Sequence, residues 1–146
     1  MESDHITEIT RVIQLAVAPV FLLTAIGTLI NALNVRLGRV VDRRRVLHER
    51  LHGKLDEDEA RATREELGLL RRRSRYIYRA IFAAVTAALF ICLVVDIAFF
   101  AALLALELAR LVAVLFILSM AALIVCLAIF LREIFIAVRE SDRHYR

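Results

Sequence analysis

Three long apolar runs dominate the sequence and restrict the folds open to it. Residues 12–33 and 111–131 contain no Asp, Glu, Lys or Arg, and residues 80–106 contain only Asp96. A run of about 18 or more apolar residues is typical of a helix that crosses a membrane. Hydrophobic residues make up 60% of the chain, above the roughly 45–50% of soluble domains. We therefore predict an all-α integral membrane protein with three transmembrane helices.

The positive charges predict how these helices are oriented. Residues 34–79 hold 14 of the 20 Lys and Arg residues, whereas Arg11 alone precedes the first run and Arg110 alone lies between the second and third. Lys and Arg are retained on the cytoplasmic side of a membrane. We expect the N-terminus outside, and the long loop and the C-terminus in the cytoplasm beside anionic lipid headgroups. This excess of Arg explains the basic pI without nucleic-acid binding, because acidic residues are interleaved with it.

The long loop is predicted to be a helical hairpin that extends the first two spans. Apolar residues recur along it in helical steps, and together they form a narrow, coiled-coil-like seam. His52 and Gly53 indicate the end of one helix, and Asp56 the start of the next. We expect a single domain, 1–146, with spans at about 12–34, 77–101 and 111–131 and the hairpin at about 35–76. The C-terminal tail is expected either to lie along the inner membrane surface or to pack on the hairpin.

The first span carries a polar stripe on one face. Polar side chains are costly to place against lipid, so the residues of this stripe are expected to face protein or water. Small and polar residues let membrane helices pack closely, and the same residues line aqueous paths in channels. Packing between helices is the favoured interpretation, and it favours a homo-oligomer; a pore lining remains the alternative. The members of this set are Gln14, Thr24, Gly27, Thr28 and Asn31.

Asp96 is the only charged residue within the second run. Ionisable groups at membrane depth usually have a partner or a task. If the chain turns near residue 103, Asp96 and Arg110 lie at similar depth on adjacent helices. We expect an intramembrane ion pair between them, with ion binding by Asp96 as the alternative.

Signatures of catalysis are missing from the sequence. It has no Gly-rich phosphate loop, nucleophile elbow or HExxH motif, and Cys92 and Cys126 do not form a metal-ligand pattern with histidines. We expect no enzymatic activity, no cofactor and no metal site.

The proline-led span, with the arginine motif that follows it, resembles a known family. The pattern R-x-x-R-x-x-D-R-x-R in the first arm, followed by L-x-x-L-x-R-R before the second span, resembles a bacterial family of small three-span inner-membrane proteins catalogued as a domain of unknown function. The resemblance implies a multi-pass protein of the bacterial inner (plasma) membrane, but no activity. Ion pairing of Asp42 with arginines is expected to fix the hairpin register. The predicted charge network comprises Arg36, Arg39, Asp42, Arg43 and Arg45.

Two functions remain open from the sequence. One is an oligomeric ion channel or pore whose first helix lines the path, which the length of the polar stripe slightly favours. The other is a non-conducting scaffold or accessory subunit whose hairpin binds a protein partner of unknown identity.

Overall fold

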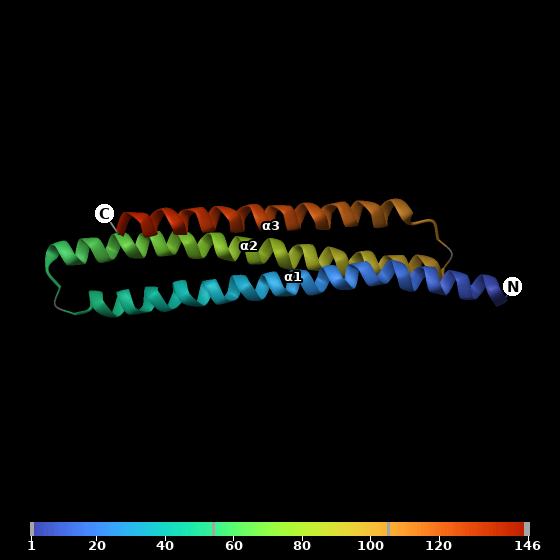
Figure 1. Ribbon diagram of the computed structural model, residues 1–146, viewed down its shortest axis with the longest axis horizontal. Helices are drawn as coiled ribbons and strands as arrows, with labels where there is room; N and C mark the ends of the chain where they lie inside the picture. Colours follow the sequence, from blue (N-terminus) through green and yellow to red (C-terminus); the bar gives the residue numbers. More distant parts are fainter. Residues whose placement is uncertain (1, 54, 105, 145–146) are drawn as a thin grey trace. The chain divides into compact units, whose positions relative to one another are not determined.

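The chain is all-α, as the sequence predicts. The computed structural model describes residues 2–53, 55–104 and 106–144, and the side chains within them from Val17 to Ala137. Three helices make up almost all of these residues: α1 (Glu2–Leu51), α2 (Glu57–Leu103) and α3 (Ala109–His144) (Figure 1). The described residues contain no strand. Each helix is long and apolar enough to cross a membrane.

The turns form where the sequence indicates them. At the end of α1, the N–H of Gly53 donates to the carbonyl of Arg50 across 3.0 Å. At the start of α2, Asp56 acts as the N-cap: its carboxylate accepts from the N–H of Glu57 at 2.8 Å, and its carbonyl accepts from the N–H of Ala60 at 2.9 Å. These bonds satisfy groups that a helix end leaves without an intrahelical partner. Between Leu103 and Ala109 the chain makes the second expected turn.

The three helices contribute to two compact units. Unit 1 comprises residues 1–30 and 83–124, and unit 2 comprises residues 31–82 and 125–146. Unit 1 contains the turn between α2 and α3, and unit 2 contains the turn between α1 and α2.

Unit 1 is held together by small side chains on α2. Ala84, Ala87 and Ile91 are fully buried and recur in steps of three and four. Small side chains let membrane helices approach closely, which replaces the hydrophobic driving force that lipid removes. The approach allows a direct hydrogen bond: the buried hydroxyl of Ser119 on α3 donates to the carbonyl of Ala87 across 2.9 Å.

Unit 2 contains the predicted hairpin seam. Its first arm buries Leu33, Val40 and Leu47, and its second arm buries residues at the matching helical steps. The buried members of the second arm are Leu67, Leu70, Ser74, Ile77 and Ala80.

The C-terminal part of α3 packs on this hairpin. Glu133 of α3 is 1% exposed and contacts arginines from both arms of the hairpin. Of the two expectations for the tail, the structure therefore shows packing on the hairpin for the residues around Glu133.

Candidate functional site

A buried carboxylate joins the three helix segments of unit 2. Glu133 on α3 accepts a short hydrogen bond from Nη1 of Arg36 on α1 through Oε2, and one of 3.1 Å from Nη2 of Arg73 on α2 through Oε1. Arg36 also stacks over Phe130, with its Cζ 5.2 Å from the ring centroid. Each carboxylate oxygen thus has a charged donor from a different helix. We call Glu133, Arg36 and Arg73 the Glu133 clamp.

Local sequence explains why these groups meet. Glu133 lies one turn beyond Phe130, and both contact Arg36, so they share the side of α3 that faces the hairpin. Burying a carboxylate costs free energy unless it is paired and hydrogen-bonded. Both conditions hold here, because two guanidinium groups share one carboxylate. The side chains of Arg36 and Arg73 remain 35% and 21% exposed, so water also reaches these arginines.

Two further ion pairs lie on the hairpin, and they involve other predicted residues. Nε of Arg43 donates to Oε1 of Glu66 on α2 across 2.8 Å, and Arg45 lies 3.6 Å from Glu49, one turn along α1. The hydrogen bond that Arg43 donates to Glu66, and then the negative charge of Glu66, raise the pKa of Arg43. The Arg43 guanidinium is therefore charged at any physiological pH.

The predicted charge network is present only in part. Arg36, Arg43 and Arg45 have carboxylate partners, but these partners are Glu133, Glu66 and Glu49. Arg39 and Asp42 are exposed, and no ion pair within the described residues includes Asp42. The contacts between the arms that we predicted for Asp42 are made instead by Glu66.

The polar stripe of α1 lies on the surface of the chain. Thr24, Gly27, Thr28 and Asn31 are all exposed, and a Cβ added to Gly27 would meet nothing within 4 Å. Each threonine hydroxyl donates to the carbonyl four residues earlier, Thr24 at 3.1 Å and Thr28 at 3.0 Å. The predicted stripe member Gln14 lies outside the residues whose side chains are described.

The stripe is opposite the face that packs. Ile26 and Leu33 are buried at 1% and 0% exposure. Successive residues of a helix turn by about 100°, so Thr24 and Thr28 project about 200° from Ile26. The four described members of the stripe are therefore on the uncovered side of α1.

The expected intramembrane ion pair is not formed in the structure. Asp96 and Arg110 are both exposed residues of unit 1, and no ion pair within the described part of the chain joins them. Arg110 instead lines a cavity of about 1110 Å³, together with Pro19, Phe99, Glu107 and other mainly apolar residues of unit 1.

Sequence reasoning missed Glu133 and Glu66 as partners of the hairpin arginines. A signal for Glu133 was present: it is the first acidic residue after the third apolar run, and Ile134 and Phe135 continue the apolar pattern around it. The hairpin contains more arginines than carboxylates. A carboxylate in the amphipathic tail that comes later in the chain therefore indicates that this tail packs against the hairpin. Glu66 immediately precedes the buried seam residue Leu67, which indicates a position at the edge of the hairpin interface.

Metal ligation has no support in the described part of the chain, where no three His, Cys, Asp or Glu side chains are grouped closely enough to hold an ion. The hydrogen-bonded side chains of the described residues are those of arginines, carboxylates, threonines, serines and a histidine.

Comparison with known proteins identifies a family but no activity. The model of the family described as "Protein of unknown function (DUF2721)" matches residues 16–143. No curated protein and no solved structure matches the chain. The matched region includes the stripe from Thr24 onward, the whole hairpin and the Glu133 clamp. With most of its length matched, and with three helices able to span a membrane, the chain belongs to the DUF2721 family.

Proposed function

We propose that this multi-pass membrane protein assembles into a homo-oligomer in the bacterial inner membrane and conducts ions along a path lined by α1. The observation that carries the proposal is the exposure of Thr24, Thr28 and Asn31 on the face of α1 opposite its buried side. Polar side chains at membrane depth are stabilised by water or by protein rather than by lipid. Several copies of α1 arranged around one axis supply both a water-filled path and neighbouring protein.

The stripe has the chemistry that an ion path needs. Threonine hydroxyls that donate to their own helix keep oxygen lone pairs for a passing cation or water. The exposed amide of Asn31 offers both donors and an acceptor. Gly27 leaves room on the same face, because no atom lies within 4 Å of a Cβ built there.

The orientation in this proposal follows the arginines. Unit 2 contains the arginine-rich hairpin, and the positive-inside rule assigns such a segment to the cytoplasm. In this orientation unit 2 presents its exposed guanidinium groups to the cytoplasm, where they attract anions and the headgroups of acidic lipids.

Reconstitution tests the proposal directly. The purified chain is expected to form a closed oligomer in native mass spectrometry and to give currents in planar bilayers. Replacing Asn31→Leu together with Thr28→Val is expected to abolish or strongly reduce the current. Thr86→Val is the matched control, since it removes a threonine hydroxyl from α2 and leaves the α1 stripe intact. The channel proposal would be overturned if native mass spectrometry showed only a monomer, or if the bilayers carried no current above the protein-free background.

A second function, that of a non-conducting scaffold, is favoured by one observation. Because the hydroxyls of Thr24 and Thr28 bond to their own backbone, the cost of placing them against another helix or lipid is small. In a scaffold, the stripe joins subunits and the hairpin of unit 2 binds a protein partner. The same two stripe substitutions then reduce the oligomer size, while wild-type protein carries no current.

A further inference from the structure

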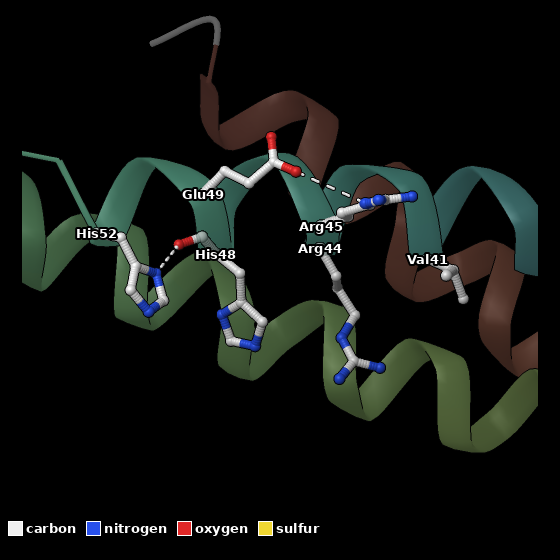
Figure 2. Close-up of a pocket in the computed structure, with 6 residues that line it drawn as sticks. All are labelled: Val41, Arg44, Arg45, His48, Glu49 and His52. Atoms are coloured by element: carbon white, nitrogen blue, oxygen red, sulfur yellow. Dashed lines mark hydrogen bonds and ion pairs between the residues drawn. The ribbon is translucent and has the colours of Figure 1, made fainter.

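The hairpin of unit 2 has a groove lined by charged residues at the end of α1. The groove has a volume of about 620 Å³ and lies along the last three turns of α1 in unit 2. Figure 2 shows Arg44, His48 and His52 projecting to one side of α1, and Arg45 and Glu49 projecting to another. We call this surface, lined by Val41, Arg44, Arg45, His48, Glu49 and His52, the Arg44 groove.

Arg44 is the arginine of the groove that lacks a carboxylate partner. No ion pair within the described residues includes it. Its Nε is buried and has almost no surface to offer a ligand, so a ligand in the groove meets the Nη groups of Arg44. An anion there accepts hydrogen bonds from these Nη groups and supplies the missing counter-charge.

The acidic residue of the groove does not supply that acceptor. The carboxylate of Glu49 pairs with Arg45 at 3.6 Å, on the side of α1 away from Arg44 (Figure 2). Once this pair is counted, Arg44 is the uncompensated charge of the lining. The groove is therefore positive even with both histidines neutral.

The histidines are positioned to add donors. Nδ1 of His52 lies 2.7 Å from the carbonyl of His48, so this nitrogen carries the proton and donates. The contact also satisfies one of the free carbonyls at the end of α1, which reduces the negative potential that a helix C-terminus presents to an anion. The other ring nitrogen of His52 and the ring of His48 remain on the exposed side of the helix (Figure 2).

Helical geometry adds arginines from α2 to the same side. Arg64 and Arg71 each precede a buried seam residue, Leu67 or Ser74, by three positions, whereas Glu66 precedes Leu67 by one. At about 100° per residue, the two arginines lie on the opposite side of the α2 seam from Glu66.

The same argument places Arg44 on α1. Arg43 and Arg44 precede the buried Leu47 by four and three positions, so they lie on opposite sides of the α1 seam. Because Arg43 pairs with Glu66, Arg44 lies on the side of the hairpin that carries Arg64 and Arg71. This side holds three guanidinium groups and no carboxylate partner for them within the described residues.

We propose that the Arg44 groove binds the phosphate group of a small organic phosphate, held by Arg44 and assisted by His48 and His52. Guanidinium groups match the geometry of phosphate oxygens and form strong, charge-assisted hydrogen bonds with them. The groove volume lies in the range of small-molecule sites, which is larger than a bare anion requires. The phosphate belongs to a free solute or to a lipid headgroup, and the site does not depend on whether the protein conducts ions.

Binding to the full chain in nonionic detergent tests the proposal. Glycerol 3-phosphate and inorganic pyrophosphate serve as soluble probes in calorimetric titrations at constant ionic strength, and nanodiscs of phosphatidylcholine with or without phosphatidylglycerol serve as the lipid probe. Arg44→Gln is expected to weaken binding about tenfold or more, the loss of one charge-assisted hydrogen bond. His48→Gln, at an exposed position that leaves the seam intact, is expected to weaken it by a smaller factor.

Arg50→Gln is the matched control, because Arg50 carries the same charge at the same end of α1 but does not line the groove. Its binding is expected to equal that of wild type. Binding of the soluble probes assigns the site to a solute. A thermal shift seen only with phosphatidylglycerol, and lost in Arg44→Gln, assigns it to a lipid headgroup. Equal weakening by Arg44→Gln and Arg50→Gln, or no response to any probe, overturns the proposal.

Discussion

Glu133 and Arg73 connect α3 to α2 through a hydrogen bond of 3.1 Å, and the carboxylate is 1% exposed. This contact, with that of Arg36, makes unit 2 a body of three helix segments rather than a two-helix hairpin. The hairpin alone is joined by a narrow seam, and α3 adds a contact with both of its arms. The stability of unit 2 should therefore depend on Glu133, which is far from the hairpin in the sequence.

Replacing Glu133→Gln is expected to destabilise the protein by about 2–4 kcal/mol, because two partly buried guanidinium groups lose their charged acceptor. Equilibrium unfolding in mixed micelles with increasing denaturing detergent measures this change. Glu66→Gln is the matched control: it removes the same charge from a pair that is 33–49% exposed, and exposed pairs contribute about 0–1 kcal/mol. Equal effects of the two substitutions would contradict the assignment of the clamp.

Leu47→Ala is expected to cost about 2–5 kcal/mol, since it leaves a cavity in the hairpin seam. Leu47 is 2% exposed, whereas its neighbour Val46 is 43% exposed. Val46→Ala should change stability by no more than about 0.5 kcal/mol. Thermal unfolding followed by circular dichroism distinguishes the two. A large loss from Val46→Ala as well would show that this face of α1 is covered in the assembled protein.

Ser119→Ala removes the hydrogen bond to the carbonyl of Ala87 inside unit 1. Hydrogen bonds between membrane helices contribute about 0.6–2 kcal/mol, so we expect a loss in that range. The unfolding assay used for the hairpin variants provides the measurement. Replacing the exposed Cys92→Ala, also within unit 1, serves as a control with no expected loss. A neutral Ser119→Ala variant would show that packing of Ala84, Ala87 and Ile91 alone joins the helices.

Topology is tested by single cysteines in a chain in which Cys92 and Cys126 are replaced by alanine. Glu57 and Glu107 are exposed residues at the two turns. With the arginine-rich hairpin inside, a membrane-impermeant maleimide added to intact cells is expected to label Glu107→Cys and to leave Glu57→Cys unlabelled until the cells are opened. The reverse pattern would invert the proposed orientation.

The helices and turns of this chain were predictable because they depend on local patterns. The apolar runs and the seam periodicity predicted helices α1 and α2. Gly53 and Asp56 predicted the turn between them, where α1 ends and α2 begins within two residues of the expected positions. Such signals act over one or two helical turns, and nothing in the fold opposes them.

The pairing of side chains was less predictable, because it depends on how distant segments align. Asp42 has arginines three residues away on either side in the sequence, yet Glu66 and Glu133 make the contacts between helices. A helical repeat shows which residues share a face, but not which neighbouring helix lies opposite that face. For the same reason the sequence identified the stripe of Thr24, Thr28 and Asn31 without revealing whether the chain itself covers it.

The distance of the Glu133 clamp along the chain has a consequence for biosynthesis. Glu133 follows Arg36 by 97 residues and Arg73 by 60, so a ribosome completes both arms of the hairpin well before it makes their common carboxylate. Until α3 arrives, Arg36 and Arg73 lack the carboxylate that they share in the folded chain. A nascent chain that stops before residue 133 therefore cannot close unit 2, and closure of the clamp marks a chain whose last helix has been made and docked.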